Sequence, residues 1–242
     1  MLTVPRRNAN AAVMLAALGA VSAAATVALT EMPQAIHRLP ASVRAVALTF
    51  DDGPDRVWPP QVLTLLRAHH ARATFFIVGA RALARPARGR AELRRGAGGD
   101  HTASHRDLQR LPVAAAREEI ARGADEIAQA GAPRPTLFRP PIGHETAGLI
   151  DWALHSEGLR TVLWTVAVER YTNHEPTTAA VRDVLARVRP GAIILAHDGG
   201  PPGRARTLAA LPGLLDGLRR RGYRVVSVGD LLSASRHAPP SR

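Results

Sequence analysis

The chain alternates short apolar segments with longer amphipathic ones from residue 44 to residue 228. Apolar runs such as 74–78 and 192–196 are too short for typical helices and are bounded by polar or turn-forming residues. The segment 113–129 instead places its charged residues on one face at helical spacing. Repeated strand-then-helix order requires crossover connections, which set neighbouring strands parallel. The pattern therefore predicts an α/β fold with a mainly parallel sheet, either open or closed into a barrel.

The expected elements fill one domain, and we find no internal repeat. In folds of this kind, chemistry gathers in the loops that follow the carboxyl ends of the strands. The polar residues directly after each expected strand are therefore the first candidates for a site. Strands are expected at 44–50, 74–78, 137–139, 161–166, 192–196 and 223–228, and helices at 61–70, 113–129, 146–156, 178–188 and 208–220.

The ends of the chain differ in character from this alternating middle. Arg6 and Arg7 precede an uncharged, Ala-rich stretch over 8–30, which is typical of a secretion signal or a membrane anchor. Either interpretation places the domain outside the cytoplasm and limits membrane contact to this segment. The four expected parts are a signal peptide or N-terminal membrane anchor at 1–30, a linker at 31–42, a catalytic domain at 43–232 and a loose C-terminal tail at 233–242.

Composition excludes several classes of function. Because there is no cysteine among the 242 residues, the chain has no disulfide, no thiolate metal site and no cysteine nucleophile. All 32 basic residues are arginine, and against 20 acidic residues they give a formal net charge of +12. The arginines are scattered apart from a run at 219–221, so we expect no specific nucleic-acid binding. Such a basic surface also suits anionic wall polymers or lipids.

Two adjacent carboxylates, Asp51 and Asp52, follow the first expected strand in the run TFDDGP at 49–54. Adjacent carboxylates repel each other unless a cation compensates their charge. A metal ion bound to one of them would leave the other as a base, and the Gly-Pro that follows would turn the pair into a cleft. The alternative is a plain acidic turn, because Asp-Gly-Pro is also good turn chemistry.

Two histidines, His101 and His105, stand four residues apart in HTASH. On a helical turn this spacing puts both imidazoles on one face, where they can reach one ion. Together with one carboxylate they would form a two-histidine, one-aspartate set with open positions, which suits zinc or another divalent metal. The alternative is a pair of surface histidines in a chain that has 10 of them.

Two further motifs end expected strands. In RPPIG, which begins at Arg139, the prolines stiffen the loop and leave the backbone N–H groups of Ile142 and Gly143 free to point at a ligand oxygen. Arg139 can hold a carboxylate by paired hydrogen bonds, or it can be an ordinary surface arginine. His197 ends a buried strand and precedes Asp-Gly-Gly, which favours a cleft loop over a core histidine.

In their order along the chain, these four motifs resemble the polysaccharide deacetylase family, the NodB-homology domain of carbohydrate esterase family 4. TFDDGP is similar to the family's first motif at every position, and HTxxH, RPPxG and LxHD follow in the family's order. The run RGYRVVSV at 221–228 is similar to the family's last strand. The resemblance covers 43–232 and implies a distorted (β/α) barrel with fewer than eight units and mainly parallel strands.

The resemblance also implies a role for each motif residue. Asp51 would be the general base, His197 the general acid, and Arg139 the residue that orients Asp51. The metal would be divalent, with zinc expected first and cobalt or another divalent ion as alternatives. Leu195 would line the acetyl pocket, and the Ile142 N–H would stabilise the oxyanion. The implied metal ligands are Asp52, His101 and His105, and the implied substrate-binding residues are Pro140, Pro141, Ile142, Gly143, Tyr171 and Leu195.

The chain departs from the family's pattern in three places. Before the first histidine no apolar strand is visible, and Asp100 replaces an asparagine, where it could support a ligand histidine. Ile142 stands where an aromatic residue is common. The family's Asp-Trp pair aligns with Arg170-Tyr171, so Glu169 could take over the tuning of the acid histidine, and Tyr171 could still offer a ring face to a sugar.

The function implied by the resemblance is metal-dependent removal of N-acetyl groups from a cell-wall or chitin-like N-acetylhexosamine polymer, with release of acetate. Peptidoglycan is expected first, because residues 1–30 would secrete the domain or anchor it at the cell wall. The alternatives are O-deacetylation of another polysaccharide and a non-catalytic glycan-binding protein on the same scaffold. We expect an extracytoplasmic monomer whose partner is its polysaccharide substrate.

Overall fold

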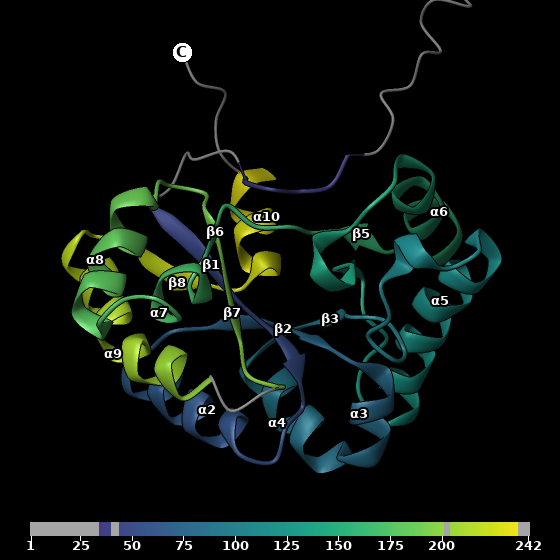
Figure 1. Ribbon diagram of the computed structural model, residues 1–242, viewed down its shortest axis with the longest axis horizontal. Helices are drawn as coiled ribbons and strands as arrows, with labels where there is room; N and C mark the ends of the chain where they lie inside the picture. The colour runs from purple at the N-terminus through teal and green to yellow at the C-terminus, as the bar shows by residue number, and fades with distance from the viewer. Residues whose placement is uncertain (1–33, 40–43, 201–203, 237–242) are drawn as a thin grey trace, which may run out of the picture. The chain divides into compact units, whose positions relative to one another are not determined.

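The computed structural model describes residues 34–39, 44–200 and 204–236 (Figure 1). The predicted leader at 1–30 lies outside these ranges. Within them, no helix combines the length and the apolar character needed to cross a membrane. The strands are β1 (Ala45–Gly53), β2 (Ala73–Ile77), β3 (Gly96–Asp100), β4 (Leu137–Phe138), β5 (Arg160–Thr161), β6 (Val166–Ala167), β7 (Ile193–His197) and β8 (Arg224–Val226). The helices are α2 (Trp58–Ala68), α3 (Gly79–Ala84), α4 (Pro86–Arg95), α5 (Val113–Gln129), α6 (Ala147–Glu157), α7 (Glu169–Thr172), α8 (Thr177–Arg187), α9 (Arg204–Arg220) and α10 (Val228–Arg236), with 3-10 turns η1 (Leu108–Arg110) and η2 (Pro141–Gly143).

All the strands join one curved sheet, and every pairing between them is parallel. The order is β5-β4-β3-β2-β1-β7-β6, and β8 pairs with the start of β1. Helices surround the outside of the sheet, with α2 and α9 on one flank and α3 and α5 on the other (Figure 1). The predicted distorted (β/α) barrel is confirmed.

The segment 34–39 bridges the two ends of the sheet. The terminal strands β5 and β6 do not pair with each other. Instead, Ile36 forms a parallel bridge with Val162, just after β5, and Arg38 forms an antiparallel bridge with Ala192, just before β7. The predicted linker at 31–42 is therefore wrong over these residues, because backbone hydrogen bonds tie them to both sides of the opening and make them part of the domain.

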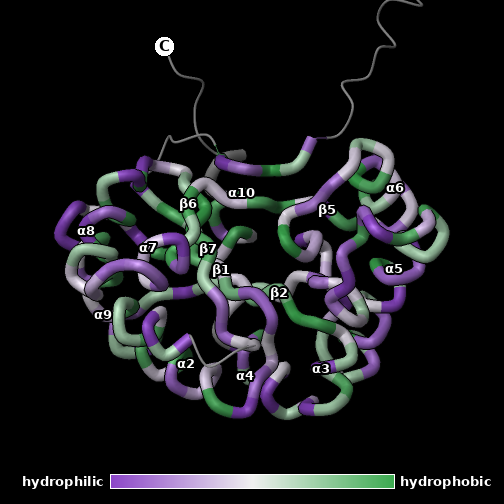
Figure 2. The backbone as a smooth tube through the Cα atoms, viewed as in Figure 1, coloured by the Kyte–Doolittle hydropathy of each residue, from purple (hydrophilic) through white to green (hydrophobic). Residues whose placement is uncertain are grey.

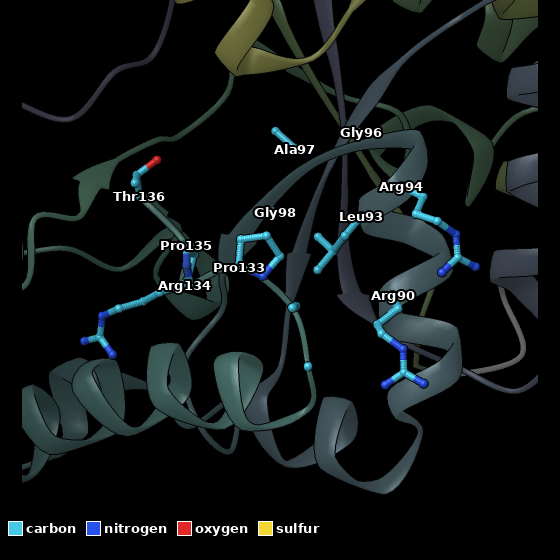
Figure 3. A pocket seen from close by; sticks show the side chains of 12 residues that line it. Arg90, Leu93, Arg94, Gly96, Ala97, Gly98, Pro133, Arg134, Pro135 and Thr136 are labelled. Atoms are coloured by element: carbon cyan, nitrogen blue, oxygen red, sulfur yellow. The ribbon is translucent and has the colours of Figure 1, made fainter.

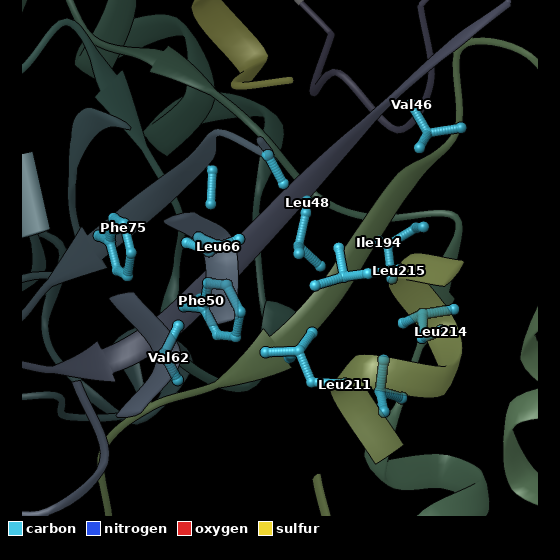
Figure 4. Close-up of a cluster of buried hydrophobic side chains, with 14 of the residues drawn as sticks. Val46, Leu48, Phe50, Val62, Leu66, Phe75, Ile194, Leu211, Leu214 and Leu215 are labelled. Atoms are coloured by element: carbon cyan, nitrogen blue, oxygen red, sulfur yellow. The ribbon is translucent and has the colours of Figure 1, made fainter. Parts of the chain in front are cut away.

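The main core lies between the central strands and the helices α2 and α9 (Figure 4). Phe50 of β1 stacks on Phe75 of β2 with ring centroids 5.4 Å apart, and both rings are fully buried. Leu66 of α2 and Leu214 of α9 belong to the same cluster. Each such side chain contributes about 1.5–3 kcal/mol by its burial. Figure 2 shows the hydrophobic residues on the central strands and on the inward sides of the helices.

The strand β3 contradicts the expectation that no strand precedes His101. Its residues pair in regular register with Ala73–Ile77 of β2. An added Cβ at Gly96 would clash with the carbonyl of Ala73, and one at Gly99 would clash with the Phe76 ring. These glycines therefore form a strand because they let the backbones approach closely, a signal that a search for apolar side chains does not detect.

Other boundaries differ from the expected ones by a few residues. The expected strand at 161–166 is two short strands, β5 and β6, separated by Val162 to Thr165. Helix α10 continues to Arg236, four residues beyond the expected end of the domain at 232, and the rest of the predicted tail, 237–242, lies outside the described ranges. Helices α3, α4, α7 and α10 have no counterpart among the expected elements.

Candidate active site

The four sequence motifs converge at the carboxyl ends of neighbouring strands. Asp51 near the end of β1 lies opposite His197 at the end of β7 in the strand ladder. Asp100 at the end of β3 lies opposite Phe138 at the end of β4, so the motifs that follow them start side by side. Because the strands are parallel, all four motifs reach the same edge of the sheet.

Asp52, His101 and His105 form a compact group of possible metal ligands. One ligand atom from each residue lies within 4.8 Å of the others. Asp52 Oδ1 is 2.9 Å from His105 Nε2 and 3.5 Å from His101 Nε2. His101 Nδ1 lies 2.7 Å from the carbonyl oxygen of Arg139. A hydrogen bond from Nδ1–H to that oxygen leaves Nε2 of the neutral ring as a lone-pair donor directed at the group.

The chemistry of this group fits a divalent metal ion. Asp52 Oδ1 is buried, and no aligned hydrogen bond satisfies it in the described part of the chain. Burial opposes ionisation of Asp52, but the close ring nitrogens of His101 and His105, together with the charge of His101 and His197, outweigh it and hold the pKa of this carboxyl well below its usual range. An ionised, buried carboxylate beside two imidazoles is a donor set typical of catalytic zinc and related ions.

The backbone of this group is strained. Asp52 has φ +73°, Thr102 has φ +66° and His105 has φ +61°, all in the left-handed region. Non-glycine residues in this region cost about 1–3 kcal/mol each and persist only where neighbouring contacts hold them. The segments that carry the possible ligands therefore depend on their surroundings for their shape.

Arg139 holds Asp51 in place by a hydrogen bond. The guanidinium is fully buried, and its Nη1 donates to Asp51 Oδ1 at 2.7 Å and to Thr49 Oγ1 at 2.8 Å. Nε donates to the Val162 carbonyl and Nη2 to the Leu163 carbonyl, each at 3.0 Å. Burial lowers the pKa of Arg139, and the charge of Asp51 acts against this change. The structure therefore brings together the pair that the motifs suggested.

His197 is paired with Glu169, the residue that the sequence analysis considered as a substitute for the family's aspartate. His197 Nδ1 lies 3.3 Å from Glu169 Oε2, and the backbone N–H of His197 donates to Glu169 Oε1 at 3.0 Å. Burial opposes protonation of His197, but Glu169, aided by Asp51, outweighs it and raises the pKa of the imidazole. Thr207, which the sequence analysis missed, donates its hydroxyl to Glu169 Oε1 at 2.9 Å.

The RPPIG loop offers one free backbone donor where the sequence suggested two. Pro140 and Pro141 are buried, while Ile142 is 61% exposed and has φ +65°. The Ile142 N–H donates to no group within the described ranges. Gly143 N–H donates to the Pro140 carbonyl at 3.1 Å, so the prediction that it is free for a ligand is wrong. The loop's own 3-10 turn uses that donor.

The two remaining predicted substrate-binding residues differ in position. Leu195 lies two residues before His197 on β7, so both side chains are on the same face of the strand. Tyr171 is only 8% exposed and belongs to the main core, with the Arg187 guanidinium 4.9 Å from its ring centroid. The prediction that Tyr171 offers a ring face to a sugar is wrong, because helix α7 turns this ring inward.

Two arginines at Asp52 are also absent from the sequence analysis. Arg204 Nη2 donates to Asp52 Oδ2 at 3.2 Å, and its Nε donates to the Gly199 carbonyl at 2.9 Å. Arg81 donates to the Asp52 carbonyl oxygen. The closeness of Arg204 to the HDGG motif is a weak signal in the sequence, whereas Arg81 is brought in only by the fold.

Asp100 supports the histidine loop differently from the way expected. Its Oδ1 accepts the backbone N–H of Thr102 at 2.9 Å, while the His101 ring bonds to the Arg139 carbonyl instead. Asp100 is fully buried, and this burial raises its pKa well above the usual range. It therefore shapes the loop backbone and does not contact the imidazole.

A cavity of about 550 Å³ lies away from these residues, along the first part of β3 (Figure 3). Gly96 and Gly98 are among its lining residues, together with Leu93, Pro133 and Arg90. None of the predicted site residues lines it. It occupies the space beside a strand that has almost no side chains, and the candidate site is at the other end of that strand.

Comparison with known proteins decides the family. The model of the polysaccharide deacetylase family matches residues 38–162, a range that includes Asp51, the histidine loop and Arg139. The chain belongs to the polysaccharide deacetylase family. A peptidoglycan-N-acetylglucosamine deacetylase of Bacillus cereus is 35% identical over 196 residues, which is 80% of this chain and 91% of that protein.

Other members of the family have the same extent. A chitooligosaccharide deacetylase of Bradyrhizobium is 35% identical over 195 residues, covering 75% of this chain and 88% of that protein. The crystal structure of a peptidoglycan N-acetylglucosamine deacetylase in complex with an N-oxidanyl-benzamide has a TM-score of 0.75 and 27% identity. The structural match covers 81% of this chain and 91% of the chain in that crystal structure. The described domain therefore has the fold and nearly the full length of these deacetylases.

Proposed function

We propose that this chain removes N-acetyl groups from an N-acetylhexosamine polymer by hydrolysis. The observation that carries the proposal is that a buried base, Asp51, lies between a fixed arginine and the metal-ligand group, with the His197–Glu169 pair on the adjacent strand. A protein that only bound a glycan would need neither an oriented base nor a histidine with a raised pKa. The family and the names of its relatives support the same activity.

Asp51 acts as the general base in this proposal. Its Oδ1 is held by Arg139, and its Oδ2 lies 3.8 Å from His101 Nε2, on the side of the metal-ligand group. The free oxygen therefore faces the place where an attacking water would be held. As this water attacks the acetyl carbon, Asp51 Oδ2 takes its proton.

His197 acts as the general acid. Glu169 Oε2 lies 3.3 Å from Nδ1 and raises the pKa of the imidazole, which favours the protonated ring. In the second step it gives that proton to the departing sugar amine, and acetate is released. The side chain is 22% exposed, which leaves it within reach of a substrate at the edge of the sheet.

The remaining groups bind the reacting carbonyl. The free N–H of Ile142 is the backbone donor that we assign to the oxyanion, and Leu195 beside His197 would line the acetyl pocket. When Asp52, His101 and His105 hold a zinc ion, or cobalt or another divalent ion, that ion would lower the pKa of water and polarise the acetamide carbonyl. Pro140 and Pro141 keep the loop rigid so that the donor at Ile142 is already in place.

We propose peptidoglycan as the first substrate to test and chitin-like oligomers as the second, following the two kinds of deacetylase among the relatives. Residues 1–30 would secrete or anchor the protein, so the enzyme would act outside the cytoplasm. We propose separately that it acts as a monomer. The net charge of +12 favours contact with anionic wall polymers.

The test is acetate release from peptidoglycan and from N-acetylglucosamine oligomers by the full chain. Reactions contain zinc or cobalt, or a chelator, and are run beside Asp51→Asn. Release that needs metal and disappears in Asp51→Asn supports the proposal. Metal binding without release from either polymer would instead favour a glycan-binding protein, and release only from an O-acetylated polysaccharide would favour an O-deacetylase.

A further inference from the structure

Helix α5 packs directly against the loop that carries the two histidines. The Ala103 N–H donates to the carbonyl oxygen of Glu119 at 2.9 Å, although that carbonyl lies within the helix. The approach is possible because position 123 is glycine: an added Cβ there would lie 2.8 Å from the Ala103 nitrogen and even closer to the Thr102 carbonyl carbon. Helical spacing over 113–129 predicts Glu119 on the charged, outward face of the helix, and this prediction is wrong because the side chain is buried against the loop.

The side chain of Glu119 is buried and points into this loop. Only 4% of the residue is exposed. Its Oε2 accepts two hydrogen bonds from one residue, the Ser104 N–H at 3.0 Å and the Ser104 hydroxyl at 2.8 Å. Its Oε1 pairs with Arg122 Nη2 at 2.8 Å, one turn along the same helix. The carboxylate is therefore fixed to a rigid helix on one side and holds the loop on the other.

The residue after Ser104 is His105, whose backbone is left-handed at φ +61°. The residues before Ser104 are held from α3, because the Gly79 N–H donates to the Thr102 carbonyl at 3.0 Å and the Ala80 N–H to the Ala103 carbonyl at 2.9 Å. At His105 itself the N–H donates to Thr102 Oγ1 at 3.1 Å. Thr102 is itself left-handed and is held through its N–H by Asp100 Oδ1, whereas Ser104, next to His105, is held by Glu119. The His105 side chain is 30% exposed, and its ring meets the His101 ring edge to face with centroids 4.9 Å apart.

We propose that Glu119 is a positioning residue for metal binding. By fixing the Ser104 backbone and hydroxyl, it holds His105 in the left-handed conformation that directs Nε2 at Asp52 Oδ1. Glu119 touches neither the metal-ligand atoms nor the substrate, and acts through the loop alone. The inference rests on the metal site assigned under the proposed function.

The experiment measures metal affinity, not turnover. Metal-free full chain is titrated with cobalt and with zinc in competition with a chelator of known affinity. Glu119→Ala is expected to bind about 10–100-fold more weakly than the wild type, because the ligand loses its support. Glu119→Gln keeps an oxygen acceptor for Ser104 and should stay within about threefold of the wild type. The matched control is Glu118→Ala, whose side chain is 71% exposed on the same helix.

A structural role alone would give a different result. If folded Glu119→Ala loses thermal stability but binds cobalt as tightly as the wild type and with the same visible spectrum, the proposal is overturned. Should Glu119→Ala fail to fold, Ser104→Ala removes the hydroxyl half of the contact at an exposed position and should weaken binding in the same direction. Unchanged affinity in Ser104→Ala would then overturn it. A wild-type chain that binds neither metal contradicts the metal site itself, and the positioning role with it.

Discussion

Both carboxylate oxygens of Glu169 contact His197: Oε2 lies 3.3 Å from the ring nitrogen Nδ1, and Oε1 accepts the backbone N–H at 3.0 Å. One acid on helix α7 thus holds the backbone at the end of β7 and lies against the histidine ring. The pKa of Glu169 is lowered, since the bonds from His197 outweigh the effect of burial, and the pKa of His197 is raised in turn. The pair therefore favours the ionised acid and the protonated ring.

Replacing Glu169 with Gln is expected to move the alkaline limb of the pH–rate profile to lower pH. Without the carboxylate the pKa of His197 falls, so the proton needed for the leaving amine is lost earlier as pH rises. At pH 8 we expect a rate loss of about tenfold or more, and a smaller loss at pH 6. Acetate release measured from pH 5 to pH 9 checks this. An alkaline limb that stays in place while the whole profile drops would show that Glu169 does not tune His197, and Glu118→Gln serves as the control.

Breaking the Asp51–Arg139 pair from the arginine side is expected to cost stability as well as activity. Arg139→Gln would leave Asp51 buried without its cation and the carbonyls of Val162 and Leu163 without donors. The expected loss is about 3–5 kcal/mol in the free energy of unfolding. Urea unfolding of Arg139→Gln, Asp51→Asn and the double variant measures it. The sum of the losses in unfolding free energy of the two single variants should exceed the loss in the double variant. If the sum equals the loss in the double variant, the two residues are not coupled.

The contrast between Gly123 and Gly148 tests how closely helix α5 meets the histidine loop. An added Cβ at Gly123 would collide with Asp100 Oδ1 and with the Thr102–Ala103 peptide, whereas one at Gly148 in α6 has open space around it. Gly123→Ala should lose about 1–3 kcal/mol by overpacking. Gly148→Ala should gain up to about 1 kcal/mol, because alanine favours helix. Thermal unfolding of both variants decides the point, and equal effects in the two would argue against close packing at α5.

The sequence was enough to predict the topology and the four motifs, because strand-then-helix order and residues at strand ends are local patterns. It was not enough for contacts made by side chains far apart in the chain. Glu169 could be suspected only from its place beside a motif, while Thr207 and Arg81 are brought to the site by the fold. The incorrect prediction for Tyr171 has the same cause, since alignment to a motif does not show which way a short helix turns its ring.

The strand β3 shows a second limit of sequence patterns. Its run of glycines has low strand propensity, and the strand forms because two parts of β2, the Ala73 carbonyl and the Phe76 ring, leave no room for side chains at Gly96 and Gly99. In the same way, residues 34–39 carry two prolines nearby and read as a linker, but backbone bridges to both ends of the sheet hold them in the domain. Neither the close packing of β3 on β2 nor the backbone bridges of 34–39 can be detected from the periodicity of hydrophobic residues.

Two buried carboxyl groups beside the site, Glu92 and Asp198, lead to a prediction about stability. Both are fully buried, and their oxygens have no hydrogen-bond partner in the described part of the chain. They face each other across Gly53, where an added Cβ would lie 2.8 Å from Asp198 Oδ1 and 3.0 Å from Glu92 Oε2. Burial, and then the neighbouring negative charges, raise the pKa of each group well above its usual range.

The raised pKa values set the sign of the pH dependence. The folded chain holds protons on these carboxyls that the unfolded chain has already released, so stability falls as pH rises above the ordinary pKa of 4.5 for Glu92. Between the ordinary pKa and the raised pKa, each pH unit lowers the free energy of unfolding by about 1.4 kcal/mol for each carboxyl that stays protonated in the folded chain. Glu92→Gln cannot ionise, and its amide can donate to Asp198. We therefore expect the variant to unfold at a higher temperature than the wild type at pH 8, by several degrees, and to show no gain at pH 4. Thermal unfolding of both proteins between pH 4 and pH 8, with Glu118→Gln as the exposed control, measures the difference. A variant less stable than the wild type at both ends of the range would mean that Glu92 is ionised and paired in the folded chain.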